Sequence, residues 1–281
     1  MQATETLPRR YTTTSKQRAW RAFRRWMPVY LLILPGMAIF LLWTLYPLLY
    51  ALVMSFFNWN PNPAASSTFL GWGNYSRALQ DPIFWQAFRN VVVFSVGTVP
   101  AQMIIGLGVA LLLDRKMAGR DLFRVLYYLP VITSWVVWCL VFEYLFNSQG
   151  GLVNWVFGDV FHLIPDTTAW IGSVSLALPT IMITAAWKGV GWTMVIFLAG
   201  LQSIPPELYE AASIDGAGSW DRFRHVTVPL LRPVLAFVSV ILTIGAFGTF
   251  LPNYIMTGPE HSTESLLTYG YTNAFSSFDF G

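Results

Sequence analysis

Long runs of apolar residues alternate with short polar segments along the 281-residue chain. A helix needs roughly 20 mainly apolar residues to cross the hydrocarbon core of a membrane, and several runs reach that length. The first run shows no signal-peptide cleavage pattern, so we expect it to be a retained helix. The pattern predicts five spans, at about residues 28–57, 88–113, 125–146, 173–201 and 230–253.

One stretch, Thr167–Pro206, carries Lys188 as its only charge, and its pattern alone leaves two arrangements open. It could form two short helices that turn just after Lys188, or one long helix with a buried lysine. Cytoplasmic loops of membrane proteins carry an excess of Lys and Arg. The next segment, Gln202–Arg232, holds three arginines and should be cytoplasmic, which requires a single helix before it.

The same rule places the N-terminus in the cytoplasm, because residues 1–27 form a tail with seven basic residues and one acidic residue. Within this tail, Trp20, Phe23 and Met27 follow helical spacing with arginines between them, which favours an interfacial helix over Ser15–Met27. The alternative is a basic flank that only orients the first span. Residues 28–281 are expected to form one transmembrane domain.

Composition supports the membrane assignment. The chain is 55% hydrophobic and 11% charged, whereas a soluble domain carries about 25% charged residues. A soluble enzyme, a disordered chain and a nucleic-acid-binding module are therefore excluded. The single cysteine, Cys139, lies in an apolar run and is expected to be a buried, inert thiol.

Motifs for catalysis are missing from the sequence. The three histidines lie in different loops, and no HExxH, CxxC or GxSxG pattern occurs. The sequence has no Gly-Lys dipeptide, and a P-loop needs one. We therefore expect no catalytic, metal or ATP-hydrolysing site in this chain.

The segment between the last two predicted spans, residues 202–229, has the features of a small helical knob. Pro205 and Pro206 can begin a helix, and acidic residues suit its first turns. Gly216 can end that helix, and a second short helix is expected from Trp220 to about Val226. A knob of this kind suits docking into a groove on a soluble partner, whereas the alternative is an amphipathic loop on the membrane.

This segment resembles the EAA motif of binding-protein-dependent ABC importer permeases. The family pattern is E-A-A, three residues, G, nine residues and I-x-L-P. Here it reads Glu210-Ala211-Ala212, Gly216 and Val226-Thr227-Val228-Pro229, with valine in place of the Ile and Leu. We refer to residues 202–229 as the EAA loop.

Three further segments resemble carbohydrate permeases of the maltose-transporter type. Gly71–Tyr75 is similar to their G-x-x-N-Y/F segment, Phe123–Pro130 to R-x-x-x-x-L-P, and Phe197–Pro205 to L-A-G-L-Q-x-I-P. The resemblance implies an all-α polytopic membrane bundle. Such permeases usually have a sixth helix after a segment like Thr268–Gly281, so this chain is expected to be either a truncated or a five-helix member.

The resemblance also implies partners and a mechanism. The partners are a sister permease subunit, two ATPase subunits that hold ATP and Mg, and an extracytoplasmic binding protein, in a bacterial or archaeal cell (inner) membrane. This chain would need no cofactor of its own. Closure of the ATPases would move the EAA loop and turn the membrane helices from inward- to outward-facing. The implied coupling residues are Glu210, Ala211, Ala212 and Gly216, with Asp215 and Arg222 as polar contacts.

Candidate substrate-path residues lie on the fourth and fifth spans, because sugars bind by aromatic stacking and by hydrogen bonds to amides. Trp and Tyr are also common at membrane interfaces without any ligand, and an intramembrane lysine can serve a subunit interface. An importer of a non-sugar solute such as glycerol 3-phosphate, and a membrane channel or enzyme, are the alternative functions. The candidates are Lys188, Trp187, Trp192, Phe247, Phe250, Asn253 and Tyr254.

Overall fold

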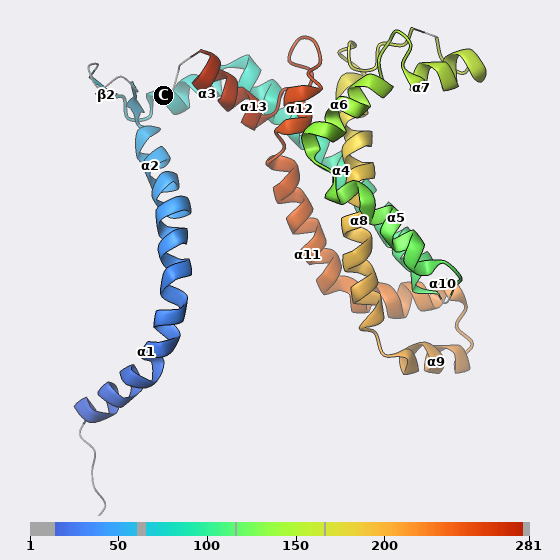
Figure 1. Cartoon of the computed structure of the whole chain (residues 1–281), viewed down its shortest axis with the longest axis horizontal. Helices are drawn as coiled ribbons and strands as arrows, with labels where there is room; N and C mark the ends of the chain where they lie inside the picture. Colours follow the sequence, from blue (N-terminus) through green and yellow to red (C-terminus); the bar gives the residue numbers. More distant parts are fainter. Residues whose placement is uncertain (1–14, 61–65, 116, 166, 278–281) are drawn as a thin grey trace, which may run out of the picture. The chain divides into compact units, whose positions relative to one another are not determined.

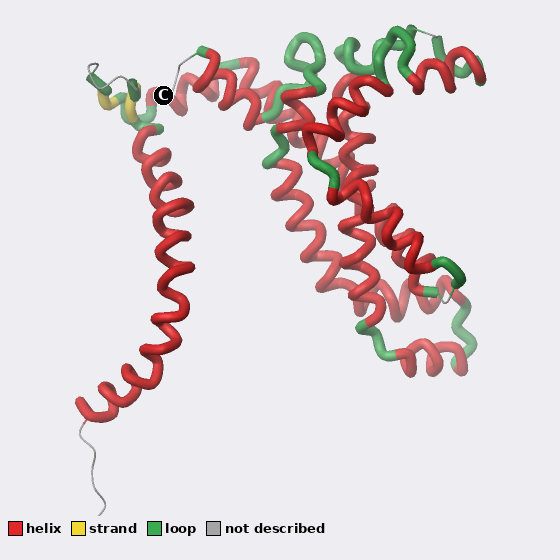
Figure 2. Tube along the Cα trace, viewed as in Figure 1, coloured by secondary structure: helices red, strands yellow, loops and turns green. Residues whose placement is uncertain are grey.

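The computed structural model describes residues 15–60, 66–115, 117–165 and 167–277. The described residues are mostly helical (Figures 1 and 2), and they form two compact units divided within α3 (Gly73–Gln80), after Ser76. In these ranges four helices are long and apolar enough to cross a membrane. The number of spans is five if one bent pair of helices is counted as a single span. The expected all-α membrane bundle is confirmed. Residues 1–14 lie outside the described part, so the cytoplasmic location of the tail stays a prediction.

The first unit is dominated by one long helical run. Helix α1 (Ser15–Phe40) continues through a π-helical turn, Leu41–Leu45, into α2 (Tyr46–Met54). The expected interfacial segment 15–27 is therefore the start of the same run as the first span rather than a separate helix. Most of its described apolar side chains are exposed within this unit, as expected of a helix that meets lipid or another subunit.

A two-stranded hairpin follows α2. Strand β1 (Phe57–Asn58) pairs antiparallel with β2 (Thr68–Phe69), with Phe57 opposite Phe69. The Asn74 side chain, at the start of α3, donates hydrogen bonds to the carbonyl oxygens of Ser55 (3.0 Å) and Phe57 (2.9 Å). These bonds satisfy the carbonyl at the C-cap of α2 and one in β1, which gives the Gly71–Tyr75 motif a structural role.

Two long helices form the centre of the second unit (Figure 1). Helix α4 (Pro82–Asp114) begins where the Asp81 carboxylate accepts a hydrogen bond from the Ile83 amide (2.8 Å). Its 33 residues span about 50 Å, more than the roughly 30 Å core of a membrane. Helix α8 (Ala177–Gln202) packs against α4 and passes Lys188 without a break. The prediction of one helix across Lys188 is confirmed.

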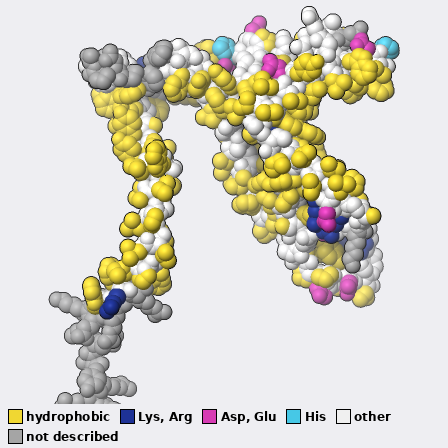
Figure 3. Space-filling view, in the orientation of Figure 1, with side chains coloured by type: hydrophobic (Ala, Val, Ile, Leu, Met, Phe, Trp, Pro, Cys, Tyr) yellow, Lys and Arg dark blue, Asp and Glu magenta, His cyan; other side chains and the backbone are white. Residues whose placement is uncertain are grey.

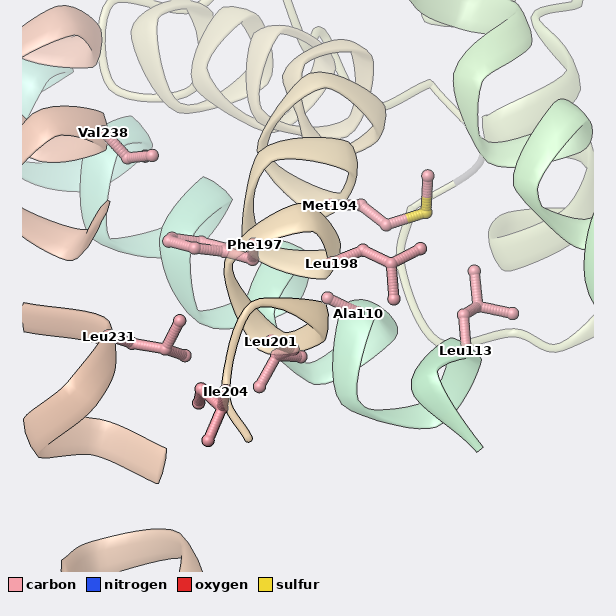
Figure 4. Packing of buried hydrophobic residues seen from close by; sticks show 9 residues of the cluster. All are labelled: Ala110, Leu113, Met194, Phe197, Leu198, Leu201, Ile204, Leu231 and Val238. Carbon is pink, nitrogen blue, oxygen red and sulfur yellow. The ribbon is translucent and has the colours of Figure 1, made fainter. Parts of the chain in front are cut away.

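Helix α11 (Val228–Phe247) packs against both α4 and α8. Buried apolar side chains from the three helices interlock at one end of the bundle (Figure 4). A second cluster, nearer the other end, includes the buried Cys139, as predicted. The first cluster contains Ala110 and Leu113 of α4, Met194, Phe197, Leu198 and Leu201 of α8, Ile204, and Leu231 and Val238 of α11.

Glycine at Gly106 lets α4 and α8 approach closely. A Cβ atom added there would contact the Thr193 hydroxyl, lie 2.8 Å from the Thr193 Cβ and lie 3.2 Å from the Met194 backbone nitrogen. We expect Gly106→Ala to separate the two helices and lower the free energy of unfolding by about 1–3 kcal/mol. Gly108→Ala is the matched control, because a Cβ there meets no atom within 4 Å. Equal thermal stability of the two variants in detergent would contradict this packing.

The third predicted span differs from the expectation of one helix over 125–146. The chain forms α5 (Arg120–Ile132) and α6 (Trp135–Leu145), and the two axes are bent by 96°. Thr133 and Ser134 are extended between them, just after Pro130 in the last turn of α5. Residues 125–142, on both sides of the break, carry no charge, so hydropathy alone gives no sign of it.

The second helix of the EAA loop is also not a separate element. Helix α10 (Ser219–Arg222) continues through a π-helical turn, Phe223–Thr227, directly into α11. Pro229 does not end this helix: the chain stays helical on both sides of it, with the π-helical turn Phe223–Thr227 just before. Gly218 is the N-cap residue of α10, and no side-chain hydrogen bond caps this helix.

Short helices cover the end of the second unit opposite the EAA loop (Figure 1). These are α7 (Leu152–Asn154) with the π-helical turn Trp155–Val160, α12 (Leu251–Ile255), and α13 (Leu266–Tyr271) with the π-helical turn Thr272–Ser276. The Tyr269 hydroxyl donates to the Asp81 carboxylate (2.6 Å), which joins α13 to the start of α4 and lowers the pKa of Asp81.

Candidate functional site

The EAA loop contains one well-formed helix, α9 (Pro206–Ile214). It begins at Pro206, and Glu207 lies in its first turn, as predicted. It ends at Gly216, whose φ of +81° is in the left-handed region. The Gly216 amide donates to the Ser213 carbonyl (3.1 Å) and the Ala217 amide to the Ala212 carbonyl (2.9 Å). This pair of bonds is a Schellman ending, so glycine at this position is required by the backbone.

Side-chain hydrogen bonds fasten α9 to the helix that follows. The Arg222 guanidinium donates to the Ser213 hydroxyl (3.0 Å), and the Ser213 hydroxyl donates to the Tyr209 carbonyl (2.6 Å). The Tyr209 hydroxyl is 3.0 Å from the Thr227 hydroxyl. Because α10 continues into α11, these bonds attach α9 to the start of the last long helix.

The outward side of the loop combines acidic and apolar side chains. Glu210, Ala211 and Asp215 are exposed, and Ala212 is half-buried. Ile214 is 87% exposed and Trp220 is 69% exposed. Large exposed apolar side chains on a loop predicted to face the cytoplasm are suited to binding a protein partner. The sequence pattern indicated Glu210, Ala211, Ala212, Asp215 and Gly216, but it gave no signal for Ile214 or Trp220. Arg222, also predicted as an interface contact, donates hydrogen bonds to Ser213 and Ser219 within the loop.

A cavity of about 600 Å³ lies among α4, α6, α8, α11 and α12. None of the described residues that line it is ionisable. Trp192 and Phe250 of the predicted substrate path line it, and Trp135 and Gln102 do so without having been predicted. Aromatic faces beside an amide can bind a hydroxylated, uncharged solute.

Glycines shape this cavity. Gly189, Gly245 and Gly248 all line it. A Cβ atom at Gly189 would collide with the side-chain amide of Gln102, so the absence of a side chain leaves room for that amide. Which side chains line the cavity depends on which faces of α4, α6 and α8 meet. Packing between the helices, rather than a local motif, determines this.

Lys188 lies beside the cavity but serves the break between α5 and α6. Its side chain is buried, with the residue 3% exposed, and its ammonium donates to the carbonyl oxygens of Pro130 (2.5 Å) and Thr133 (2.8 Å) and to the Thr133 hydroxyl (3.1 Å). The ammonium also lies 5.0 Å from the Trp135 ring centroid and 5.3 Å from that of Trp138. Carbonyls freed at a broken helix need donors inside a membrane, and Lys188 supplies them.

The other predicted path residues do not line this cavity. Trp187 stacks on Trp138 (4.5 Å between ring centroids) and borders a separate apolar cavity of about 720 Å³. The Asn253 amide donates to the Thr263 carbonyl (2.7 Å), so it holds a loop. Tyr254 stacks on Phe250 (5.2 Å), which lines the cavity, and Phe247 is partly exposed outside it.

A second polar contact joins α5 to α8 near the EAA loop. With the Gln202 amide oriented to satisfy both guanidinium groups, its oxygen accepts hydrogen bonds from Arg120 (2.5 Å) and Arg124 (3.0 Å). The segment from Arg124 to Pro130 is thus attached to α8 at both ends, through Gln202 and through Lys188. These contacts involve the Phe123–Pro130 and Phe197–Pro205 segments, so both of these carbohydrate-permease motifs have a structural role.

The chain matches a family described as binding-protein-dependent transport system inner membrane components over residues 102–278. It is 35% identical over 252 residues to the probable ABC transporter permease protein YurN of Bacillus subtilis (strain 168), covering 88% of this chain and 85% of YurN. It is 34% identical to the lactose transport system permease protein LacF of Rhizobium radiobacter, covering 88% of this chain and 83% of LacF. It is also 34% identical to the trehalose/maltose transport system permease protein MalF of Thermococcus litoralis, with 87% and 83% covered.

The fold is shared with a solved bacterial ABC transporter involved in the import of the acidic polysaccharide alginate, with a TM-score of 0.79, 20% identity, and coverage of 94% of this chain and 89% of that chain. A second structure of the alginate transporter contains an alginate pentasaccharide-bound periplasmic protein (TM-score 0.79, 22% identity, 94% and 88% covered). The chain belongs to the family of binding-protein-dependent transport system inner membrane components. It is a multi-pass permease of the cell membrane, of the sugar-transport type of ABC importer.

Proposed function

We propose that this chain forms part of the path for an uncharged sugar or related polyol delivered by an extracytoplasmic binding protein. The observation that carries the proposal is the cavity of about 600 Å³, with Trp135, Trp192 and Phe250 beside the Gln102 amide. Aromatic rings stack on the apolar faces of sugar rings, and amides bind hydroxyl groups. The names of LacF and MalF, which are lactose and trehalose/maltose permeases, agree with this substrate class.

We further propose that the EAA loop binds an ATPase subunit and that a sister permease completes the path. The loop offers Glu210, Ala211 and Ile214 on its outward side and is fastened to α11 through Arg222 and Tyr209. ATP and Mg would belong to the ATPase subunits, and the N-terminal tail would lie in the cytoplasm. A binding-protein partner is supported by the complex of the alginate transporter with its periplasmic protein.

The alternative of an anionic solute such as glycerol 3-phosphate receives less support from the site. A path for an anionic solute would be expected to have a basic vestibule, and Lys188 is the only lysine or arginine among the candidate path residues. The Lys188 ammonium is committed to two carbonyls and one hydroxyl, and Lys188 is not among the residues that line the cavity. The part of the path contributed by the described residues of this cavity is therefore uncharged.

Removal of an aromatic face from the cavity tests the substrate proposal. We expect Trp192→Ala to raise the KM for uptake about two- to tenfold, because a stacked ring contributes about 0.5–1.5 kcal/mol and 1.4 kcal/mol is a factor of ten. Gln102→Leu should raise the KM in the same direction. Transport of the solute into vesicles containing the complex is the measurement.

Trp187→Ala is the matched control, since Trp187 lies on the same helix but borders the other cavity. Its KM should stay close to that of the unmodified complex. An unchanged KM in Trp192→Ala and Gln102→Leu, with a raised KM in Trp187→Ala, would place the path elsewhere and reject this site.

A further inference from the structure

An exposed apolar face lies on the segment Leu152–Leu163, between α6 and α8. Asn154 fixes its orientation from the opposite side. The Asn154 amide donates to the carbonyls of Ser148 (3.2 Å) and Thr168 (3.0 Å), and its oxygen accepts from the Trp170 indole (2.7 Å). Asn154 and Gly158, four residues apart, are both buried. The outward face of this segment is therefore set by a defined anchor.

The outward face is strongly apolar. Phe161 is 60% exposed and Leu163 is 70% exposed, and Leu152 and Val160 are exposed as well. The Phe157 and Phe161 rings lie side by side, with 6.4 Å between their centroids. Figure 3 shows hydrophobic side chains along the edge of this segment from which the spans descend, and acidic and histidine side chains on the opposite edge. The segment is thus amphipathic.

Several observations select lipid as the occupant of this face. Residues 147–172 contain no Lys or Arg, so the positive-inside rule places them outside the cytoplasm. The apolar face continues the exposed apolar surface of α6, where Leu140 and Val141 are exposed. Helix α5 has 13 residues, about 20 Å, which is shorter than the membrane core of about 30 Å, and α6 turns 96° away from it. The outer end of this broken pair therefore needs its own attachment at the membrane surface.

We propose that Leu152–Leu163 is an interfacial anchor that lies in the outer headgroup layer with its apolar face in the lipid. Such a helix buries its apolar side about 5–10 Å into the boundary between headgroups and acyl chains. The anchor holds the end of α6, and through α6 it holds Trp135 at the cavity. This role does not depend on which solute is transported.

Photo-crosslinking in the intact complex in its own membrane tests the anchor. Phe161→p-benzoylphenylalanine places the photoreactive group on the apolar face, and Asp159→p-benzoylphenylalanine, two residues away, is the matched control. Mass spectrometry after irradiation identifies the adducts. We expect phospholipid adducts at Phe161 to exceed those at Asp159 several-fold, and uptake to persist in both variants.

A second position, Val160→p-benzoylphenylalanine, covers the case in which the Phe161 variant does not assemble. Phospholipid adducts at Val160 in excess of those at Asp159 support the anchor equally. Crosslinks from Phe161 or Val160 to the binding protein or the sister permease would overturn it and identify a protein-docking surface. Equal lipid yields on both faces, or none at either apolar position, would also overturn it.

Discussion

Lys188→Met should destabilise the protein severely and abolish transport for that reason. The substitution removes the ammonium that donates to the Pro130 and Thr133 carbonyls, at the point where α5 ends and α6 begins. The Thr133 carbonyl is left without the donor that the structure gives it, whereas the Pro130 carbonyl keeps the Thr133 hydroxyl (2.7 Å). A buried acceptor without a donor costs about 1–3 kcal/mol, and the methionine side chain offers none. The positive charge at the C-terminal end of α5 is lost as well. We expect a loss of roughly 2–5 kcal/mol in the free energy of unfolding, measured by thermal inactivation of the purified complex.

Val195→Met is the matched control for this prediction. Val195 lies on the same helix, the product residue is the same, and its side chain is exposed. This variant should retain both stability and uptake. A Lys188→Met complex with normal thermal stability and a raised KM for the solute would contradict the structural role and make Lys188 a substrate ligand instead.

Ala211→Trp should abolish the association of the chain with its ATPase while leaving the chain folded. Ala211 is exposed on α9, so the larger side chain meets no atom of this unit that would oppose it, but it would prevent close approach of a partner. Loss of shape complementarity at a compact docking surface removes most of its binding free energy. The amount of ATPase that co-purifies with the chain, and the ATP hydrolysis of the purified material, are the measurements.

Ala118→Trp is the control for that substitution. Ala118 is exposed on the loop between α4 and α5, which the positive-inside rule also places in the cytoplasm, but it lies outside the EAA loop. ATPase recovery should be close to normal in this variant. If both tryptophan variants lost the ATPase equally, the interface would not be confined to the EAA loop, and if neither did, the docking surface assigned to α9 would be wrong.

Features with local causes were predictable from the sequence. The start of α9 at Pro206 and its end at Gly216 follow from residues that favour those positions whatever their surroundings. The single α8 helix across Lys188 was predicted from the distribution of arginines, which reports on topology rather than on packing. The family was predicted from the spacing of the EAA loop and is confirmed by the match over residues 102–278.

Features that depend on distant contacts were not predictable in the same way. The break between α5 and α6 occurs in an uncharged run, and its carbonyls are satisfied by Lys188, 55 residues beyond Thr133. The same contact holds the Lys188 ammonium at this break, whereas the sequence left substrate passage and a structural role both open. Gln102 and Trp135 line the cavity because α4 and α6 turn particular faces toward α8. No periodicity in one helix specifies which neighbour its polar residue will meet.

Co-purification tests the central claim, that this permease works by coupling its EAA loop to a separate ATPase. The chain is expressed with its neighbouring genes and purified through a tag on the chain itself, and ATP hydrolysis is assayed with and without the soluble binding protein. We expect that an ATPase is recovered, that its hydrolysis is stimulated by the liganded binding protein, and that recovery is lost in the Ala211→Trp variant. A stable, folded chain that brings no ATPase with it would show that the EAA loop does not couple this permease to an ATPase.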